Sequence, residues 1–230
     1  MNQICLAKDS SDLTIIIPQH GCWEQTVACC SGLWRHHDRH LSITVVDDGS
    51  SEKDRKASKR FLQPGVKWIE QQHTGITSAW NRGIQSSQTR YIALLNNDVL
   101  TIRPWINHLI DQLRKNPEKL IGAEWRRERL ISQLQDSVLR DEQQILSGWC
   151  LCFERETYEK VGEFDESMSL YWSDTDWQLR WKQHFSKSSQ DLGVLPQGCL
   201  QHVGHVSTRR LKTRTSRWHQ DRARFLSKWS

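Results

Sequence analysis

Three polar clusters of the chain contain side chains that could bind a ligand or take part in a reaction. They are DD at residues 47–48, NND at 96–98 and SDTD at 173–176. Carboxylate oxygens suit a hard divalent cation, accept hydrogen bonds from a nucleotide, and can take a proton from a hydroxyl group. Each cluster also has a purely structural interpretation, because Asp and Asn favour turns and acidic residues stabilise the first turn of a helix.

The chemical interpretation assigns a separate role to each side chain. Asp48 could accept hydrogen bonds from a base or a ribose, and Asp98 could join diphosphate oxygens around a metal ion. Asp174 and Asp176 stand two apart in an expected helix and do not share a face, so only one of them is needed for proton transfer. His202, in LQHVG, could complete a metal shell through its imidazole or be an ordinary structural histidine.

The segments around these clusters indicate a parallel α/β sheet. Apolar, β-rich runs are expected to be strands at 13–17, 41–46, 66–70 and 91–95, with helices at 23–37, 51–62 and 75–86 between them. Strands that are hydrophobic throughout and alternate with helices are typical of a parallel sheet covered on both faces. The ligand crevice of such a sheet lies beyond the carboxyl ends of the strands, where PQHG, DDGS and NNDV fall.

The second half of the chain is expected to continue as one domain with the first. A helix is predicted at 104–115, a strand at 145–154, a short helix ending at Gly162 and another helix beginning near Ser173. The stretch 124–144 is very polar, so we expect a loop or helix that faces the substrate rather than a core element. No linker rich in Pro or Gly divides the chain, and a single domain over residues 1–230 is expected.

Composition and charge narrow the class of protein. Of 32 basic residues, eight lie between Arg209 and Lys228, beside the single acid Asp221. Such a tail is a candidate for peripheral contact with the inner face of a membrane, or simply a solvated helix end. Seven cysteines without paired C-x-x-C spacing indicate neither a disulfide framework nor a zinc knuckle. With no signal peptide or apolar run of membrane-spanning length apparent, a cytoplasmic protein is expected.

The ordered set of motifs resembles the family 2 glycosyltransferases of GT-A fold, over nearly the whole chain. The motifs are TIIIP, DDGS, HTGITSAWNRGI, NND, SDTD and the late HVGHVS. The resemblance implies an α/β fold with a mixed, mostly parallel central sheet flanked by helices. It also implies a nucleotide-binding half over about 10–100, an acceptor and catalytic half over about 101–208, and a basic C-terminal helix over about 209–230.

The resemblance also implies roles for individual residues. Asp174 is the expected general base, and Asp98 with His202 is expected to bind Mn²⁺ or Mg²⁺. The positions expected to contact the nucleotide are Pro18, Gln19, Asp48, Gly75, Asn81 and Asn97. The candidates for acceptor contact or for support of the site are Trp149, Trp172 and Asp176. The chain departs from the family pattern at His73, Trp80 and Ser173, where Asn, Arg and Glu are usual.

The implied function is transfer of a sugar from a nucleoside diphosphate, UDP or dTDP, to a hydroxyl of a glycan or lipid-linked glycan, with inversion. A bacterial polysaccharide transferase, for example of rhamnosyl type, fits this description, and nucleic acid is not an expected partner. Two other classes stay open. One is an inactive GT-A-like protein that binds carbohydrate or nucleic acid, which the twelve tryptophans would suit. The other is a sugar nucleotidyltransferase, although PQHGCWEQ lacks a Gly-rich, basic phosphate loop.

Overall fold

A computed structural model describes residues 12–37, 41–140, 143–204 and 213–229, and its centre is a seven-stranded sheet with the order β10-β6-β9-β4-β1-β2-β3. The strands are β1 (Leu13–Gln19), β2 (Ser42–Asp48), β3 (Lys67–Gln71), β4 (Tyr91–Leu95), β6 (Ile121–Gly122), β9 (Cys150–Glu154) and β10 (Gly193–Val194). Strands β1 to β4 are parallel, whereas β9 pairs antiparallel with both β4 and β6. The expected mixed, mostly parallel sheet is therefore confirmed.

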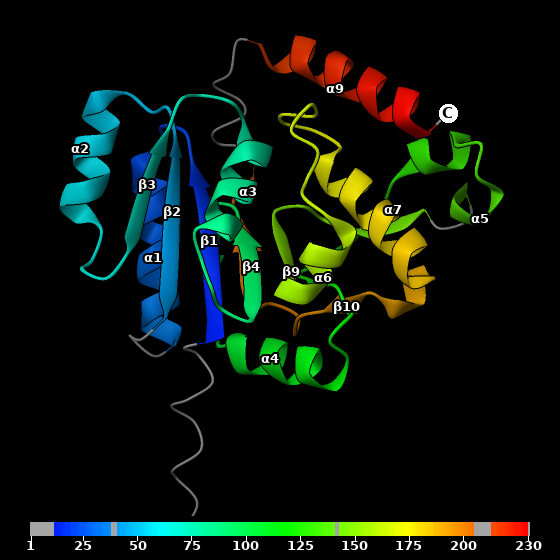
Figure 1. The fold of residues 1–230 in the computed structure, drawn as a ribbon. Helices are drawn as coiled ribbons and strands as arrows, with labels where there is room; N and C mark the ends of the chain where they lie inside the picture. Colours follow the sequence, from blue (N-terminus) through cyan, green and yellow to red (C-terminus); the bar gives the residue numbers. More distant parts are fainter. Residues whose placement is uncertain (1–11, 38–40, 141–142, 205–212, 230) are drawn as a thin grey trace, which may run out of the picture.

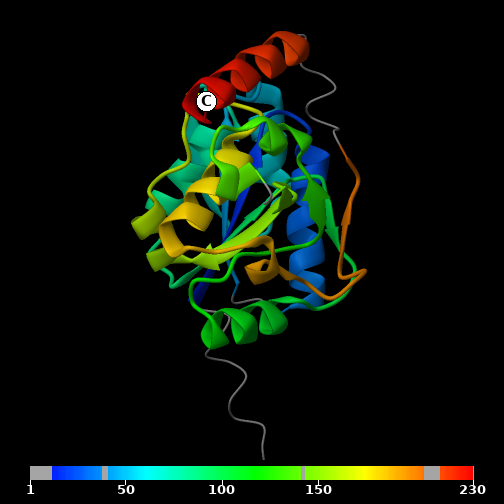
Figure 2. The ribbon, with the colours of Figure 1, turned by 90° about the vertical axis from the view of Figure 1, so that its right-hand side faces the viewer.

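Helices cover both faces of this sheet (Figures 1 and 2). They are α1 (Trp23–His36), α2 (Glu52–Phe61), α3 (Ile76–Gln85), α4 (Ile106–Lys115), α6 (Arg155–Val161) and α7 (Ser173–Phe185). Because successive strand residues point to opposite faces, β1 buries Ile15 and Ile17 against α1 and α4, and Ile16 against α3 and the helices beyond it. Both faces of β1 are apolar, as a strand covered on both sides requires.

Two short antiparallel sheets lie beside the main one. Strand β5 (Val99–Thr101) pairs with β11 (Leu200–His202), and β7 (Trp125–Arg127) pairs with β8 (Gln144–Leu146). In the first pair His202 lies opposite Val99, so the β5–β11 ladder brings the late histidine next to the NND cluster.

Two strand predictions differ from the structure in their bounds. Strand β1 does not end at Pro18 but continues to Gln19, paired with β2. Strand β4 pairs only with residues up to Ile16, so Pro18 lies where β1 has one neighbour and a missing N–H is tolerated. The strand predicted at 145–154 is two strands, β8 and β9, which the sequence SGW separates.

The prediction that 124–144 lies outside the core was wrong. This stretch forms β7, the 3₁₀-helix η2 (Arg129–Gln133), the short helix α5 (Ser137–Arg140) and the start of β8. Four apolar side chains of this stretch are buried, namely Leu130, Ile131, Leu134 and Leu139. They belong to one apolar cluster with Ile145 of β8, Met168, Leu179 of α7 and Phe225 of the C-terminal helix. Polar residues dominate the stretch because only one side of it packs against this apolar cluster.

The C-terminal helix α9 (Arg214–Trp229) docks on the rest of the protein. Phe225 is fully buried, and Figure 1 shows α9 across the end of the molecule at which the parallel strands terminate. In the part of the chain that the structure describes, no helix combines the length and apolar character needed to cross a membrane. Cys150 and Cys152 are buried, and no described cysteine forms a disulfide.

Candidate active site

Two adjoining cavities lie at the carboxyl ends of the parallel strands. The first contains five of the six positions expected to contact the nucleotide, namely Pro18, Gln19, Asp48, Gly75 and Asn97. The second, of about 440 Å³, contains five further predicted residues: Asp98, Trp149, Trp172, Asp174 and His202. Ile76, Asn96 and Leu170 line both cavities, so the predicted residues form two connected parts of one site.

The Asp48 carboxylate organises the first cavity. It accepts hydrogen bonds from the backbone N–H groups of Thr74 (2.8 Å) and Gly75 (3.0 Å) and from the side chains of Gln71 and His73 (2.8 Å each). Both carboxylate oxygens are therefore engaged by protein donors. Asp48 holds the loop after β3 in place, and any contact with a nucleotide is made in addition to these bonds.

Two histidines stack at the mouth of this cavity. The rings of His20 and His73 lie 4.0 Å apart between centroids at an interplanar angle of 24°. With Asp48 they form a group whose candidate ligand atoms lie within 4.8 Å of one another, which could hold a metal ion. His73 already donates through Nδ1 to the Asp48 carboxylate and contacts Arg217 through Nε2 (3.2 Å), so a metal here would displace existing bonds.

A second candidate metal group lies where the two cavities join. Asp98 is buried, and its carboxylate lies 3.1 Å from Nε2 of His202. The side-chain oxygen of Asn96 is buried and has no hydrogen-bond partner among the described residues. Two oxygen donors and one imidazole nitrogen make a plausible donor set for Mn²⁺ or Mg²⁺, and the orphaned amide oxygen marks this group as the better fit.

Asp174 faces the second cavity from the first turn of α7. Its side chain is 13% exposed and accepts a hydrogen bond of 3.2 Å from Arg126. Burial alone would lower the pKa of the Arg126 guanidinium, but the charges of Asp174 and Glu128 outweigh this effect and raise that pKa. Gly148 leaves the space that Asp174 occupies, since a Cβ there would lie 2.5 Å from the carboxylate.

Aromatic side chains form much of the wall of the second cavity. The rings of Trp149 and His202 stack with 5.0 Å between centroids, and those of Trp172 and Trp218 meet edge to face at 5.1 Å. Trp80, which stands where the family usually has Arg, is 4% exposed and lines the same cavity. Such a wall offers apolar faces to a sugar ring, while the nearby carboxylates offer hydrogen-bond acceptors.

Two predicted residues lie outside both cavities. Asn81 is buried and uses its amide to bind the backbone of Phe164 and the side chains of Tyr158 and Glu166. It therefore fastens α3 to the segment before α7, which differs from the nucleotide contact that the resemblance implies. Asp176 is fully buried and joins α7 to α9 through several partners. Those on α9 are Lys228 and Trp229, and Arg180 is a further partner within α7.

The structure also brings in residues that the sequence did not single out. Arg126 and Glu124 reach the second cavity from the stretch 124–144, and Arg217 reaches the first from α9. Nothing in the local sequence marks these side chains, because Arg126 lies 48 positions from its partner Asp174. Only His20, next to the predicted Gln19, had a signal in the sequence, since it follows a strand end of the sheet.

The sheet and the side chains at its carboxyl edge are those of a ligand-binding α/β protein. A mostly parallel sheet with carboxylates and amides gathered at its carboxyl edge is typical of α/β enzymes that bind their ligands there. The model of glycosyl transferase family 2 matches residues 14–175. The chain belongs to this family, and it is a transferase enzyme of GT-A fold.

Curated relatives agree with this assignment over part of their length. "Chondroitin synthase" of Escherichia coli is 27% identical over 110 residues, which are 45% of this chain and 16% of that protein. "Uncharacterized glycosyltransferase YibD" of Escherichia coli K12 is 25% identical over 95 residues, 40% of this chain and 28% of that protein. The matches therefore cover well under half of these relatives.

A solved structure shares the fold. The chain superimposes on the structure described as "Crystal structure of GalNAc-T7 with UDP, GalNAc and Mn2+" with a TM-score of 0.62 and 15% identity. The match covers 76% of this chain and 41% of the other. At this identity the likeness concerns the fold alone, and it confirms the expectation of a GT-A sheet.

Proposed function

We propose that the chain transfers a sugar from a nucleoside diphosphate, UDP or dTDP, to a hydroxyl group of a glycan or lipid-linked glycan, with inversion. One observation carries this proposal: the cavity with Asp174 and the Asp98–His202 pair adjoins the cavity with Asp48. The nucleoside would occupy the first cavity, the diphosphate the junction at Asn96, and the sugar with its acceptor the second. The GalNAc-T7 structure, described with UDP and Mn²⁺, supports this class of donor.

Asp98 and His202, with the unpartnered oxygen of Asn96, would hold Mn²⁺ or Mg²⁺. The ion would supply positive charge for the departing diphosphate. In the first cavity, the stacked rings of His20 and His73 form an edge for the nucleoside, and the Arg217 guanidinium adds a cation at the same mouth. These residues bind and orient the donor, so that its anomeric carbon faces the second cavity.

Asp174 would act as the general base. In the displacement, the acceptor oxygen bonds to the anomeric carbon while the bond from that carbon to the diphosphate oxygen breaks. The hydroxyl proton passes to the Asp174 carboxylate, which Arg126 holds on its other side. Attack opposite the leaving group inverts the anomeric centre.

The side chains of the second cavity indicate the kind of acceptor. The aromatic wall of Trp149, Trp172 and Trp218 suits the faces of sugar rings, which favours a glycan acceptor. An inactive binding protein would retain the wall but would not need the Asp98–His202 pair and Asp174 in one cavity. A cytoplasmic location, with the basic C-terminal helix near anionic lipid, is consistent with the exposed Arg214 on α9.

Substitution of Asp174 by Asn tests this function. Removal of a general base should lower the rate of UDP-sugar turnover by about 10²–10⁴-fold. UDP with Mn²⁺ should still raise the melting temperature, because Asp174 lies outside the nucleotide cavity. Asp111→Asn, an exposed acid on α4, is the matched control and should leave both measurements unchanged. Turnover by Asp174→Asn at the parental rate would contradict the assignment of the base.

A further inference from the structure

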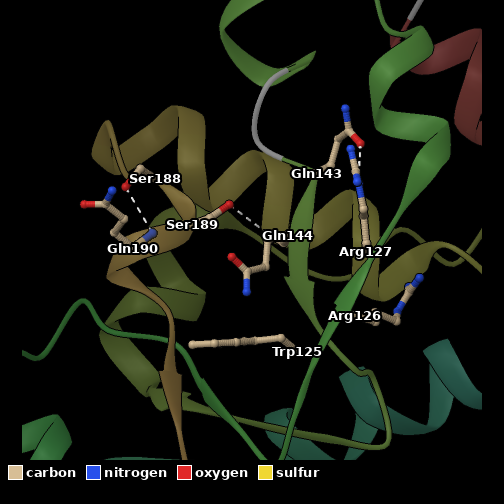
Figure 3. Close-up of a pocket in the computed structure, with 8 residues that line it drawn as sticks. All are labelled: Trp125, Arg126, Arg127, Gln143, Gln144, Ser188, Ser189 and Gln190. Carbon is tan, nitrogen blue, oxygen red and sulfur yellow. Dashed lines mark hydrogen bonds between the residues drawn. The ribbon is translucent and has the colours of Figure 1, made fainter.

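A third cavity, of about 760 Å³, lies outside the site described above (Figure 3). It is bounded by strand β7, the start of β8 and the 3₁₀-turn η3 (Ser189–Asp191). The described side chains that line it include aromatic, amide, hydroxyl and guanidinium groups, and none of them is acidic. No part of the proposed transfer reaction requires this cavity.

Strand β7 stands between this cavity and the catalytic one. Its side chains alternate, so Arg126 reaches Asp174 on one side while Trp125 and Arg127 face the other. Arg126 lines both cavities. A chain-like ligand that leaves the second cavity over β7 would therefore arrive directly on Trp125.

Trp125 provides a platform of the kind that sugars stack on. Trp125 is a large hydrophobic residue, yet 52% of its surface is exposed. Figure 3 shows the ring across the base of the cavity, with Gln144 above it and the turn of Ser188–Gln190 opposite. A sugar ring has apolar C–H faces and a rim of hydroxyl groups, which match an indole face surrounded by amides and hydroxyls.

The walls of this cavity are held in place by a buried cation. Lys182 is 2% exposed and donates to the backbone oxygen of Gln144 and to the hydroxyl of Ser189, at 3.0 Å each. Ser188 and Asp191 close the turn with a reciprocal capping box. Strand β8 and η3 are thus tied together in advance, so a ligand would not have to order them.

We propose that the third cavity binds sugar units of the acceptor glycan beyond the unit that receives the transferred sugar. The proposal rests on the proposed function, because it takes the occupant of the second cavity to be a glycan. Trp125 stacks on one sugar ring, and Gln144, Gln190 and Arg127 bind its hydroxyl groups. The protein then prefers acceptors of several sugar units over single sugars.

An immobilised panel of mono- to hexasaccharides, containing neutral and uronate-bearing chains, tests the subsite with the full chain. The parent should bind some chains of three or more units more tightly than their monosaccharides. Trp125→Ala should weaken binding of those chains by about tenfold, as loss of about 1.4 kcal/mol would give. It should leave the monosaccharide value unchanged. Phe61→Ala, at a residue of α2 that is 50% exposed, is the matched control and should bind like the parent.

Gln190→Ala, on the opposite wall, guards against a local folding defect in the first variant and should weaken the same chains. Binding that shows no dependence on chain length, or that both variants leave unchanged, would overturn the subsite. The melting-temperature shift with UDP and Mn²⁺ separates the two proposals. If that shift is present while the length dependence is absent, the subsite alone is wrong. If UDP with Mn²⁺ also gives no shift, the proposed function itself fails.

Discussion

At the scale of single residues, the carboxylates of this site differ in what they already bind. Asp48 is engaged by donors from the loop after β3, whereas the Asp98 carboxylate lies 3.1 Å from Nε2 of His202. In the sequence, Asp48, Asp98 and Asp174 fall at the ends of predicted strands or at the start of a predicted helix, which predicted that they converge. It could not show that Asp48 is largely a loop anchor, because two of its donors are the backbone N–H groups of Thr74 and Gly75, which residue types do not reveal.

The metal assignment gives a prediction at this scale. Asp98→Asn replaces a charged ligand by a neutral one, so Mn²⁺ should no longer increase the melting-temperature shift that UDP produces. His20→Gln serves as the comparison, because it removes the imidazole from the alternative group of His20, Asp48 and His73. We expect the His20 variant to keep the Mn²⁺ effect. If His20→Gln lost the Mn²⁺ effect and Asp98→Asn kept it, the metal would instead be assigned to the group of His20, Asp48 and His73.

At the scale of elements, α9 connects distant parts of the site. Asp221 is 1% exposed and accepts hydrogen bonds from the backbone N–H groups of Leu170 (2.9 Å) and Tyr171 (3.1 Å). Leu170 lines both cavities, and Arg217 and Trp218 of the same helix line one each. The sequence marked α9 as a basic helix, but it did not show that the single acid of this helix is buried against a segment that lines the site.

Substitution of Asp221 by Asn should loosen the segment that α9 holds. Both backbone N–H groups donate to the same carboxylate oxygen, and the variant offers them an uncharged amide group instead. The loss should cost about 1.5–3 kcal/mol, the contribution of a hydrogen bond to a charged group. The melting temperature should fall, and the stabilisation by UDP should decrease with it. Asp111→Asn again serves as the control for the loss of a charge. A variant with a lower melting temperature but a parental UDP shift would show that α9 supports the fold and not the site.

The distribution of apolar residues explains which helices and strands could be predicted from the sequence. Strands β1, β2 and β4 are buried along almost their whole length and alternate with helices, so their hydrophobic pattern is enough to predict them. The stretch 124–144 was misjudged because its core contacts come from a few spaced residues such as Leu130 and Ile131, which pack on α7 and α9. Arg126 was missed for the same reason, since its position depends on the β7–β8 pair.

For the molecule as a whole, one half-buried histidine should influence stability as a function of pH. Burial, with a smaller effect of the nearby His36, lowers the pKa of His37 from 6.5 to about 4. The unfolded chain therefore binds a proton between these values that the folded chain does not, and folding stability decreases as the pH falls through that window. Above pH 6.5 both states are neutral at this residue, and the effect vanishes.

His37→Leu should make the melting temperature fall less steeply than in the parent between pH 6.5 and pH 4. The exposed His108→Leu variant is the control and should follow the parental curve. Since carboxylates also contribute to acid denaturation, the informative quantity is the difference between variant and parent at each pH. A constant difference across this window would contradict the role of His37.

The central claim is that the two adjoining cavities form one site for a nucleoside diphosphate sugar and its metal. A crystal structure of the protein with UDP and Mn²⁺, with anomalous data for manganese, tests it most directly. We expect the uracil in the cavity of Asp48 and the manganese peak in contact with Asp98 and His202. A manganese peak between His20, Asp48 and His73, or UDP bound outside both cavities, would contradict it.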